Sequence, residues 1–136
     1  MKTLILHAES FSYTPVAKEI RSAEEASTNT INLGRCLVVF VAVEAGDESK
    51  SGLYELFSEQ LGSALREVGE NVLVLYPFVH LTDSPAKPLV ALEILKQLEL
   101  KLRDRGTHAM RAPFGWTKKF SISVFGHPLA ERSFRF

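Results

Sequence analysis

The sequence contains a single cysteine, Cys36, among its 136 residues. One cysteine excludes a disulfide within the chain and any cysteine-rich zinc site, as in proteins of the reducing cytosol. Cys36 opens the apolar run Cys-Leu-Val-Val-Phe-Val-Ala-Val, so we expect a small buried side chain. No apolar run approaches the roughly 20 residues that cross a bilayer, and polar His7 and Glu9 come too early for a signal peptide. We therefore expect a cytoplasmic protein with no membrane partner.

Motifs with a fixed chemical spacing are also missing. The four histidines form no i, i+4 pair of the kind found in helical zinc sites, and none stands near the cysteine or a suitable carboxylate cluster. Ser121 and Ser123 lack a Gly-x-Ser-x-Gly setting, and Gly34 stands alone rather than in a glycine-rich phosphate loop. We therefore expect no metal, no other cofactor and no serine nucleophile.

An excess of charge is absent as well, because 16 basic and 16 acidic residues give a formal net charge of +0. A protein that holds long nucleic acid by its phosphates normally carries a basic excess. If RNA is the substrate, we expect this chain to hold only the end of the molecule, while other domains or subunits hold the rest.

Apolar sequence, by contrast, is plentiful. Hydrophobic residues make up 46% of the chain and include nine phenylalanines, and 136 residues suit one hydrophobic core. We predict a single globular domain spanning residues 1–136.

The spacing of apolar residues predicts a mixed α/β order. Strands are predicted at residues 3–7, 11–15, 35–44, 71–76, 107–111 and 118–125, and helices at 51–68 and from 88 to 106. The run 35–44 is apolar throughout, which indicates burial on both faces and a central place in the sheet. Residues 18–32 are mostly polar and predict a surface connection, with a short helix at 23–26 as the alternative. Two helices between buried strands predict two crossovers, and hairpin-like pairs at both ends predict antiparallel additions to a mixed sheet.

Lys118 begins the last predicted strand. Alternation places its side chain on the same face as Phe120, Ile122 and Val124, which is the apolar face. Its ammonium group therefore reaches water along a buried stem, forms a structural ion pair, or occupies a polar pocket. The residues alone leave these alternatives open.

Three other polar residues lie next to predicted strands or turns. His80 follows the strand at 71–76, and the C-terminal ends of such strands are where α/β sheets place ligands; otherwise its ring is tied to loop backbone. His127, in Gly-His-Pro, is expected to organise its turn. Glu131 stands beside Arg132, and on position alone it is solvated or paired with a base.

Three segments in this order resemble one family. They are Tyr-Pro-Phe-Val-His-Leu at 76–81, Ala-Pro-Phe-Gly followed by aromatic-x-Lys-x-Phe at 112–120, and Gly-His-Pro-Leu-Ala-Glu at 126–131. The N-terminal Leu-Ile-Leu-His-x-Glu and the strand end Val-Ala-Val-Glu also match. Together they are similar to the N-terminal editing domain of archaeal threonyl-tRNA synthetases.

The resemblance implies a fold like that of D-aminoacyl-tRNA deacylases, usually paired as a homodimer. It implies hydrolysis of the ester between L-serine and the terminal adenosine of threonine tRNA, assisted by the neighbouring ribose 2′-hydroxyl. The implied partners are the aminoacylated 3′ end of tRNA(Thr) and the rest of a synthetase, fused or as a separate subunit.

The resemblance also implies site residues. Lys118, His80 and Glu131 match the catalytic positions of the family. The expected substrate contacts are Val43 and Val79 through their backbone, Phe114 beside the terminal adenosine, and Trp116 and Thr117 before the site lysine. Thr117 departs from the tyrosine that the family commonly carries there, so a phenol hydroxyl is lost.

Two rival functions stay open on the sequence. A D-aminoacyl-tRNA deacylase would act on the mirror-image amino acid with the same fold. A non-catalytic module of a synthetase would bind its ligand without hydrolysis, and Lys118→Ala would then leave any trace activity unchanged.

Overall fold

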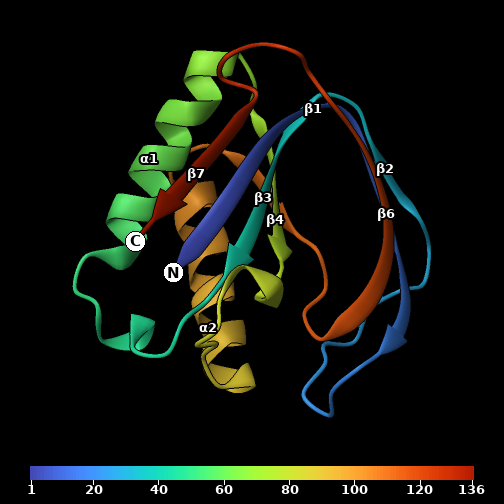
Figure 1. Cartoon of the computed structure of the whole chain (residues 1–136), viewed down its shortest axis with the longest axis vertical. Coiled ribbons are helices and arrows are strands. Elements are labelled where there is room, and N and C mark those ends of the chain that lie inside the picture. The colour runs from blue at the N-terminus through green and yellow to red at the C-terminus, as the bar shows by residue number, and fades with distance from the viewer.

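One long strand, β1 (Lys2–Lys18), organises the sheet. In this computed structural model, which describes residues 1–136, β1 pairs antiparallel with four other strands. Its first half lies between β3 (Cys36–Ala42) and β7 (Glu131–Arg135), and its second half lies between β2 (Ile31–Leu33) and β6 (Trp116–Val124). Because β1 bends between the two halves, the sheet curls around its own concave face (Figure 1).

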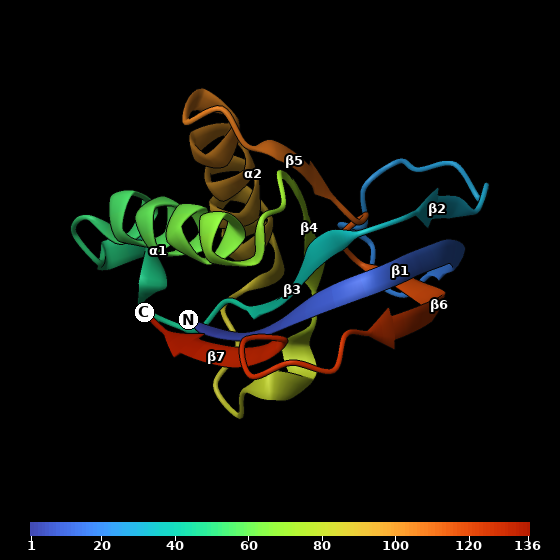
Figure 2. The ribbon, with the colours of Figure 1, turned by 90° about the horizontal axis from the view of Figure 1, so that it is seen from above.

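The remaining strands continue the sheet in parallel. β3 pairs with β4 (Val72–Pro77), and β4 pairs with β5 (His108–Arg111). The connections are the helices α1 (Leu53–Val68) and α2 (Pro88–Asp104), which lie together on one side of the sheet (Figures 1 and 2). The predicted mixed sheet with two crossover helices is therefore confirmed. Neither helix has the length and apolar character needed to cross a membrane.

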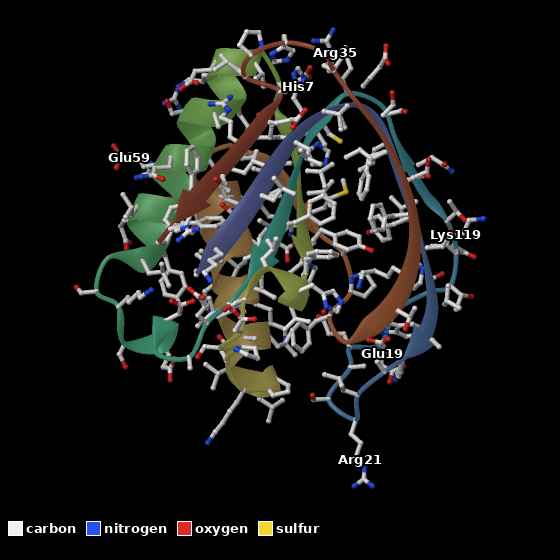
Figure 3. All side chains as sticks on the ribbon, viewed as in Figure 1. His7, Glu19, Arg21, Arg35, Glu59 and Lys119 are labelled. Carbon is white, nitrogen blue, oxygen red and sulfur yellow. The ribbon has the colours of Figure 1, made fainter.

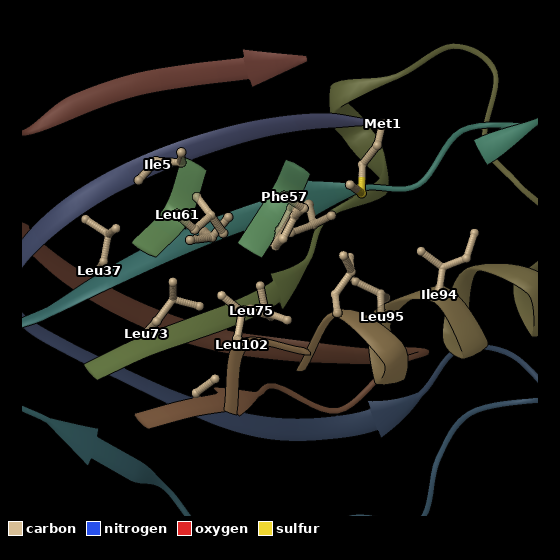
Figure 4. Packing of buried hydrophobic residues seen from close by; sticks show 14 of the residues in the cluster. Met1, Ile5, Leu37, Phe57, Leu61, Leu73, Leu75, Ile94, Leu95 and Leu102 are labelled. Carbon is tan, nitrogen blue, oxygen red and sulfur yellow. The ribbon is translucent and has the colours of Figure 1, made fainter. Parts of the chain in front are cut away.

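Two apolar clusters fill the two sides of the sheet. The larger one lies between the sheet and the helices and includes Ile5, Leu37, Phe57 and Leu95 (Figure 4). The smaller one fills the curl of the sheet with side chains from several strands: Ala8, Phe11, Tyr13, Cys36, Val38, Phe40, Val74, Tyr76 and Ala112. Cys36 is fully buried, and burial raises the pKa of its thiol to about 11, so the expectation of a buried apolar side chain is confirmed.

The predicted strands at 3–7 and 11–15 are one continuous strand, and the prediction of two was wrong. A bulge inserts an extra residue between Ala8 and Ser10, because these two residues oppose the consecutive pair Val124 and Ser123 of β6. An extra residue reverses which face the following side chains take. Phe11 therefore joins Ala8 on the concave face, and polar Glu9 is left at the bulge without breaking the strand.

The C-terminal part of the chain also differs from the prediction. The strands predicted at 107–111 and 118–125 form β5 and β6, but they do not pair with each other. β6 pairs with β1, on the far side of the curl from β5. The short strand β7 was not predicted, and residues 23–26 form no helix. Such long-range pairings leave no periodic signal in the strands that make them.

Candidate active site

A cavity of about 480 Å³ opens where the C-terminal ends of β3 and β4 meet the first turns of α2 and the loop that leads into β6. Its walls are mainly apolar, and the polar side chains in them are few. The lining comprises residues 19, 20, 41–43, 76–80, 85, 86, 88, 91, 95, 114–118 and 120. A concave apolar site with a few convergent polar groups is the usual form of a small-ligand site.

Lys118 supplies the cation of this cavity. Its Nζ donates hydrogen bonds to the carbonyl oxygens of Trp116 at 2.8 Å and Pro113 at 3.2 Å, and it lies 4.9 Å from the ring centroid of Tyr76. An ammonium group has three protons, so one remains for a ligand. Burial lowers the pKa of Lys118 from 10.5 to about 8, although the nearby carboxylates of Glu19 and Glu24 act in the opposite direction.

The strand geometry around Lys118 agrees with the predicted alternation. Lys118, Ile122 and Val124 are partly buried on the concave side, whereas Lys119 is exposed on the other side (Figure 3). The ring of Phe120 packs against Tyr76, with ring centroids 5.4 Å apart. Lys118 forms no ion pair, and its ammonium lies at the cavity, hydrogen-bonded to two backbone carbonyls.

His80 lies on another wall of the same cavity, in the short 3-10 turn η2 (Val79–Leu81) that follows β4. Its ring packs edge-on against Phe78, with ring centroids 5.2 Å apart, and its side chain is exposed. The loop is tied to β3 at both ends, because Phe78 N donates to Val41 O at 2.8 Å and Ala86 N donates to Val43 O at 3.0 Å. The fold therefore holds the imidazole at the opening of the cavity.

Glu44 forms a hydrogen bond with the loop that follows η2. The hydroxyl of Thr82 donates to Glu44 Oε1 at 2.6 Å, and the α-ammonium of Met1 lies 3.0 Å from Glu44 Oε2. The hydrogen bond from Thr82, together with the positive charge of Met1, lowers the pKa of Glu44 to about 2, although burial opposes the shift. The sequence showed Glu44 only as the end of a strand, because its partner Thr82 lies in a loop without regular spacing.

The five residues expected to contact the substrate all line the cavity. Val43 lies at the end of β3, and Val79 lies at the rim with about half of its surface exposed. Phe114 comes from the turn before β6, and Trp116 and Thr117 are the first two residues of β6, directly before Lys118. The structure therefore brings together Lys118, His80 and every expected substrate contact.

Glu131 is the exception, because it does not line the cavity. It is the first residue of β7, exposed, and paired in register with Leu6 of β1. Leu4 and Leu6 lie on the same sheet face and pack against the concave cluster, so the carboxylate projects over that face. Within one chain, the structure does not place Glu131 with Lys118 and His80.

A second polar cluster lies at the other end of the molecule (Figure 3). His7 Nδ1 lies 2.8 Å from His127 Nε2, His7 Nε2 lies 3.0 Å from Glu70 Oε1, and Arg35 also donates to Glu70 at 2.7 Å. His127 Nδ1 accepts a hydrogen bond from Leu129 N at 3.2 Å, which confirms that this histidine organises its turn. No group of three or more histidine, cysteine or acidic side chains is arranged to hold a metal ion.

Comparison with known families gives a match over almost the whole chain. The family described as the archaea-specific editing domain of threonyl-tRNA synthetase matches residues 1–135. The chain is 40% identical over 134 residues to a threonine–tRNA ligase of Nitrosopumilus maritimus, covering 98% of this chain and 21% of that protein. It is 40% identical over 138 residues to the threonine–tRNA ligase editing subunit of Saccharolobus solfataricus, covering 99% of this chain and 34% of that protein. The chain thus spans between a fifth and about a third of these relatives.

Among solved structures, the c-Myc DNA unwinding element binding protein is similar to this chain. The TM-score is 0.68 with 11% sequence identity, and the alignment covers 100% of this chain and 99% of that chain. At such low identity the likeness concerns the fold alone. The likeness over the full length agrees with the predicted single α/β domain.

Proposed function

Because the chain belongs to the archaea-specific editing-domain family of threonyl-tRNA synthetase, we propose that it hydrolyses L-seryl-tRNA(Thr) and thereby removes wrongly attached serine. The observation that carries this proposal is the partly buried ammonium of Lys118, which lines a largely apolar cavity with one N–H free for a ligand. The neutral charge of the chain agrees with a substrate held here only by its end.

The proposed reaction is ester hydrolysis without a covalent enzyme intermediate. The oxygen of a water molecule bonds to the ester carbonyl carbon, and the bond from that carbon to the ribose oxygen breaks. The ribose oxygen takes up a proton, so the products are free serine and tRNA with an intact terminal adenosine. The neighbouring ribose 2′-hydroxyl helps to position or activate the water.

The chain supplies position and charge for this reaction. Lys118 donates a hydrogen bond from its remaining N–H to the carbonyl oxygen, where negative charge develops as water attacks. His80, at the cavity opening, orients the water, and a fixed orientation lowers the entropic part of the barrier. Phe114 and Trp116 line the same cavity and would contact the terminal adenosine.

Selection between serine and threonine gives this reaction its purpose. The two amino acids differ by one methyl group, which is worth only about 1–3 kcal/mol of discrimination in a single binding site. A second site that admits the smaller side chain and excludes the larger one adds an independent selection step. The cavity is proposed to be this second site.

The direct test measures serine release from L-seryl-tRNA(Thr), with L-threonyl-tRNA(Thr) and D-seryl-tRNA(Thr) as parallel substrates. We expect rapid release of L-serine only. Preferred release of D-serine would assign the chain to the D-aminoacyl-tRNA deacylases instead, and inertness towards all three substrates would contradict the proposal. Full turnover of a seryl-tRNA that ends in 2′-deoxyadenosine would contradict the role of the ribose hydroxyl.

We further propose that the chain acts as a homodimer in the cytoplasm, together with the catalytic part of a threonyl-tRNA synthetase. Glu131 supports the dimer, because it lies outside the cavity of its own chain and is exposed on the sheet face beside Leu6. A catalytic role for Glu131 therefore requires a second copy that brings this carboxylate to the cavity.

Mixing two inactive variants tests this arrangement. If each site takes Lys118 from one copy and Glu131 from the other, equal amounts of Lys118→Met and Glu131→Gln, exchanged as dimers, should restore about a quarter of the wild-type sites. The reason is that half of the dimers are mixed, and each mixed dimer contains one intact site. Each variant alone should be inactive in the serine-release assay. No gain on mixing would place Glu131 outside the site or show that both residues act within one chain.

A further inference from the structure

The carboxylate of Glu24 holds the loop that precedes Lys118. Glu24 Oε2 accepts a hydrogen bond from the backbone N–H of Phe114 at 2.8 Å. The same carboxylate accepts two hydrogen bonds from the guanidinium of Arg111, at the end of β5, one of them 2.8 Å long. Burial alone would raise the pKa of Glu24, but the hydrogen bonds from Arg111 and Phe114 outweigh it and lower this pKa, so the group is ionised at neutral pH.

Backbone hydrogen bonds extend this contact along the loop. Glu24 N donates to Phe114 O at 3.1 Å, and the indole Nε1 of Trp116 donates to Glu24 O at 2.7 Å. Nearby, Glu19 N donates to Gly115 O at 2.8 Å. The segment 19–24 therefore lies against residues 114–117. Two carboxylates take part in this contact, because the hydroxyl of Thr117 donates to Glu19 while Phe114 N donates to Glu24.

The loop held in this way is the one that fixes the Lys118 ammonium. Its Nζ has two hydrogen bonds within the chain, and both acceptors are carbonyl oxygens of this loop, those of Pro113 and Trp116. Both acceptors lie within one residue of a group that segment 19–24 binds. Pro113 lies in the turn before β6, whereas Trp116 is the first residue of β6 and also pairs with Lys18 of β1. If the turn moved away from Glu24, the Pro113 carbonyl would move with it and the alignment of the two acceptors would be lost.

We propose that Glu24 is a positioning residue of the active site, which holds the 113–117 loop so that the Pro113 and Trp116 carbonyls direct the Lys118 ammonium into the cavity. Glu24 neither lines the cavity nor forms a hydrogen bond with Lys118, so it acts on the ammonium through the loop and through its negative charge. Arg111 also donates a hydrogen bond to Glu99 of α2 at 3.2 Å. This bond between β5 and α2 remains when the Glu24 carboxylate is removed.

Two effects of removing Glu24 act on Lys118 in opposite directions. Loss of a nearby negative charge, without movement, would lower the pKa of Lys118 further. Release of the loop would admit water to the ammonium and raise its pKa towards the ordinary value of 10.5. The direction of the shift therefore distinguishes positioning from charge alone.

The test titrates Lys118 in Glu24→Ala by NMR of protein with 13C-labelled lysine, and the Lys118 signal is the one missing from Lys118→Met. We expect the pKa of Lys118 to rise, and we expect kcat for serine release to fall by about ten- to a hundredfold with a smaller change in KM. A pKa that stays constant or falls would overturn the inference. If Glu24→Ala does not fold, Glu24→Asp must also raise the pKa of Lys118 and lower kcat, each by a smaller amount. Aspartate keeps the charge but is one methylene shorter, so its carboxylate lies farther from the loop.

Glu25→Gln is the matched control. This neighbouring carboxylate pairs with Lys18, its side chain is 93% exposed, and it forms no hydrogen bond with residues 113–117. Its removal should leave both the titration and kcat unchanged, and a loss equal to that of Glu24→Ala would overturn the inference. The kinetic part rests on the proposed function, whereas the titration needs no substrate, so the two can fail separately.

Discussion

Lys118→Met is expected to reduce the rate of serine release by at least about a hundredfold, the size of effect seen when a donor to a developing negative charge is removed. Methionine has nearly the length and volume of lysine but cannot donate a hydrogen bond to the ester carbonyl. The measurement is single-turnover release of serine from L-seryl-tRNA(Thr). An unchanged rate would show that the ammonium takes no part in the reaction.

The pH dependence of the wild-type protein should report the same group. The ammonium form is the donor, and burial lowers its pKa to about 8. The enzymatic rate, corrected for the uncatalysed loss of the ester, should therefore fall as the pH rises through about 8. Lys118→Met should lack this step, since the group that titrates is gone.

Lys119→Met provides the matched control for both measurements. Lys119 is the next residue of β6, and its exposed side chain points away from the cavity (Figure 3). The rate of serine release by Lys119→Met should stay within about twofold of the wild-type rate, because substitutions of exposed residues away from a functional site have small effects.

A stability measurement separates loss of chemistry from loss of fold in Lys118→Met. The folded-state pKa of Lys118, about 8, lies below the ordinary value of 10.5, so the unfolded chain binds more protons between these pH values. Wild-type stability should therefore rise with pH across this interval relative to Lys118→Met. Below pH 8 the ammonium is charged, and its partial burial lowers the free energy of unfolding by the full amount. In that pH range the Lys118→Met protein should be more stable than the wild type.

Gly115→Ala should be the most damaging single-methyl change in the loop. Gly115 has φ +79°, a conformation that costs other residues about 1–3 kcal/mol. An added Cβ would also stand 2.8 Å from the backbone Cα of Ala23 and 2.9 Å from a side-chain atom of Ile20. The Cα of Ala23 belongs to the backbone and cannot move aside as the end of a flexible side chain can. The loop must therefore move away from segment 19–24. We expect a loss of serine release of tenfold or more, up to about a hundredfold.

Gly34→Ala is the corresponding control, since the added methyl would meet nothing within 4 Å and φ is not positive there. Circular dichroism and thermal unfolding of both variants should show whether the Gly115→Ala protein remains folded. A folded Gly115→Ala protein with normal serine release would contradict the view that this loop positions Lys118.

The parts of the fold with regular spacing were predictable from the sequence. The uninterrupted apolar run beginning at Cys36 gave β3, and the three- and four-residue spacing after Gly52 gave α1. The inward direction of Lys118 followed from alternation alone. These predictions depend on local geometry, which repeats every two residues in a strand and every 3.6 in a helix.

The features that the sequence did not reveal depend on contacts between distant residues. The bulge after Ala8 and the separation of β5 from β6 result from pairing across the whole chain. The role of Glu24 was not predictable for the same reason, because its partners Arg111 and Phe114 lie 87 and 90 residues away in the sequence. The resemblance to the editing-domain family, in contrast, pointed to Lys118 and His80 before any geometry was known.

The pairing of β1 also bears on how the chain acquires its structure during synthesis. β1 is synthesised before the other strands of this sheet, yet Lys2 pairs with Arg135 and Thr3 with Phe134 of β7. Contacts of such large sequence separation form late and slow folding, because a long loop must close before they form. Until the last strand emerges, one edge of β1 stays unpaired beside β3 and open to unwanted strand addition. Folding of the nascent sheet therefore depends on the prompt synthesis of β7.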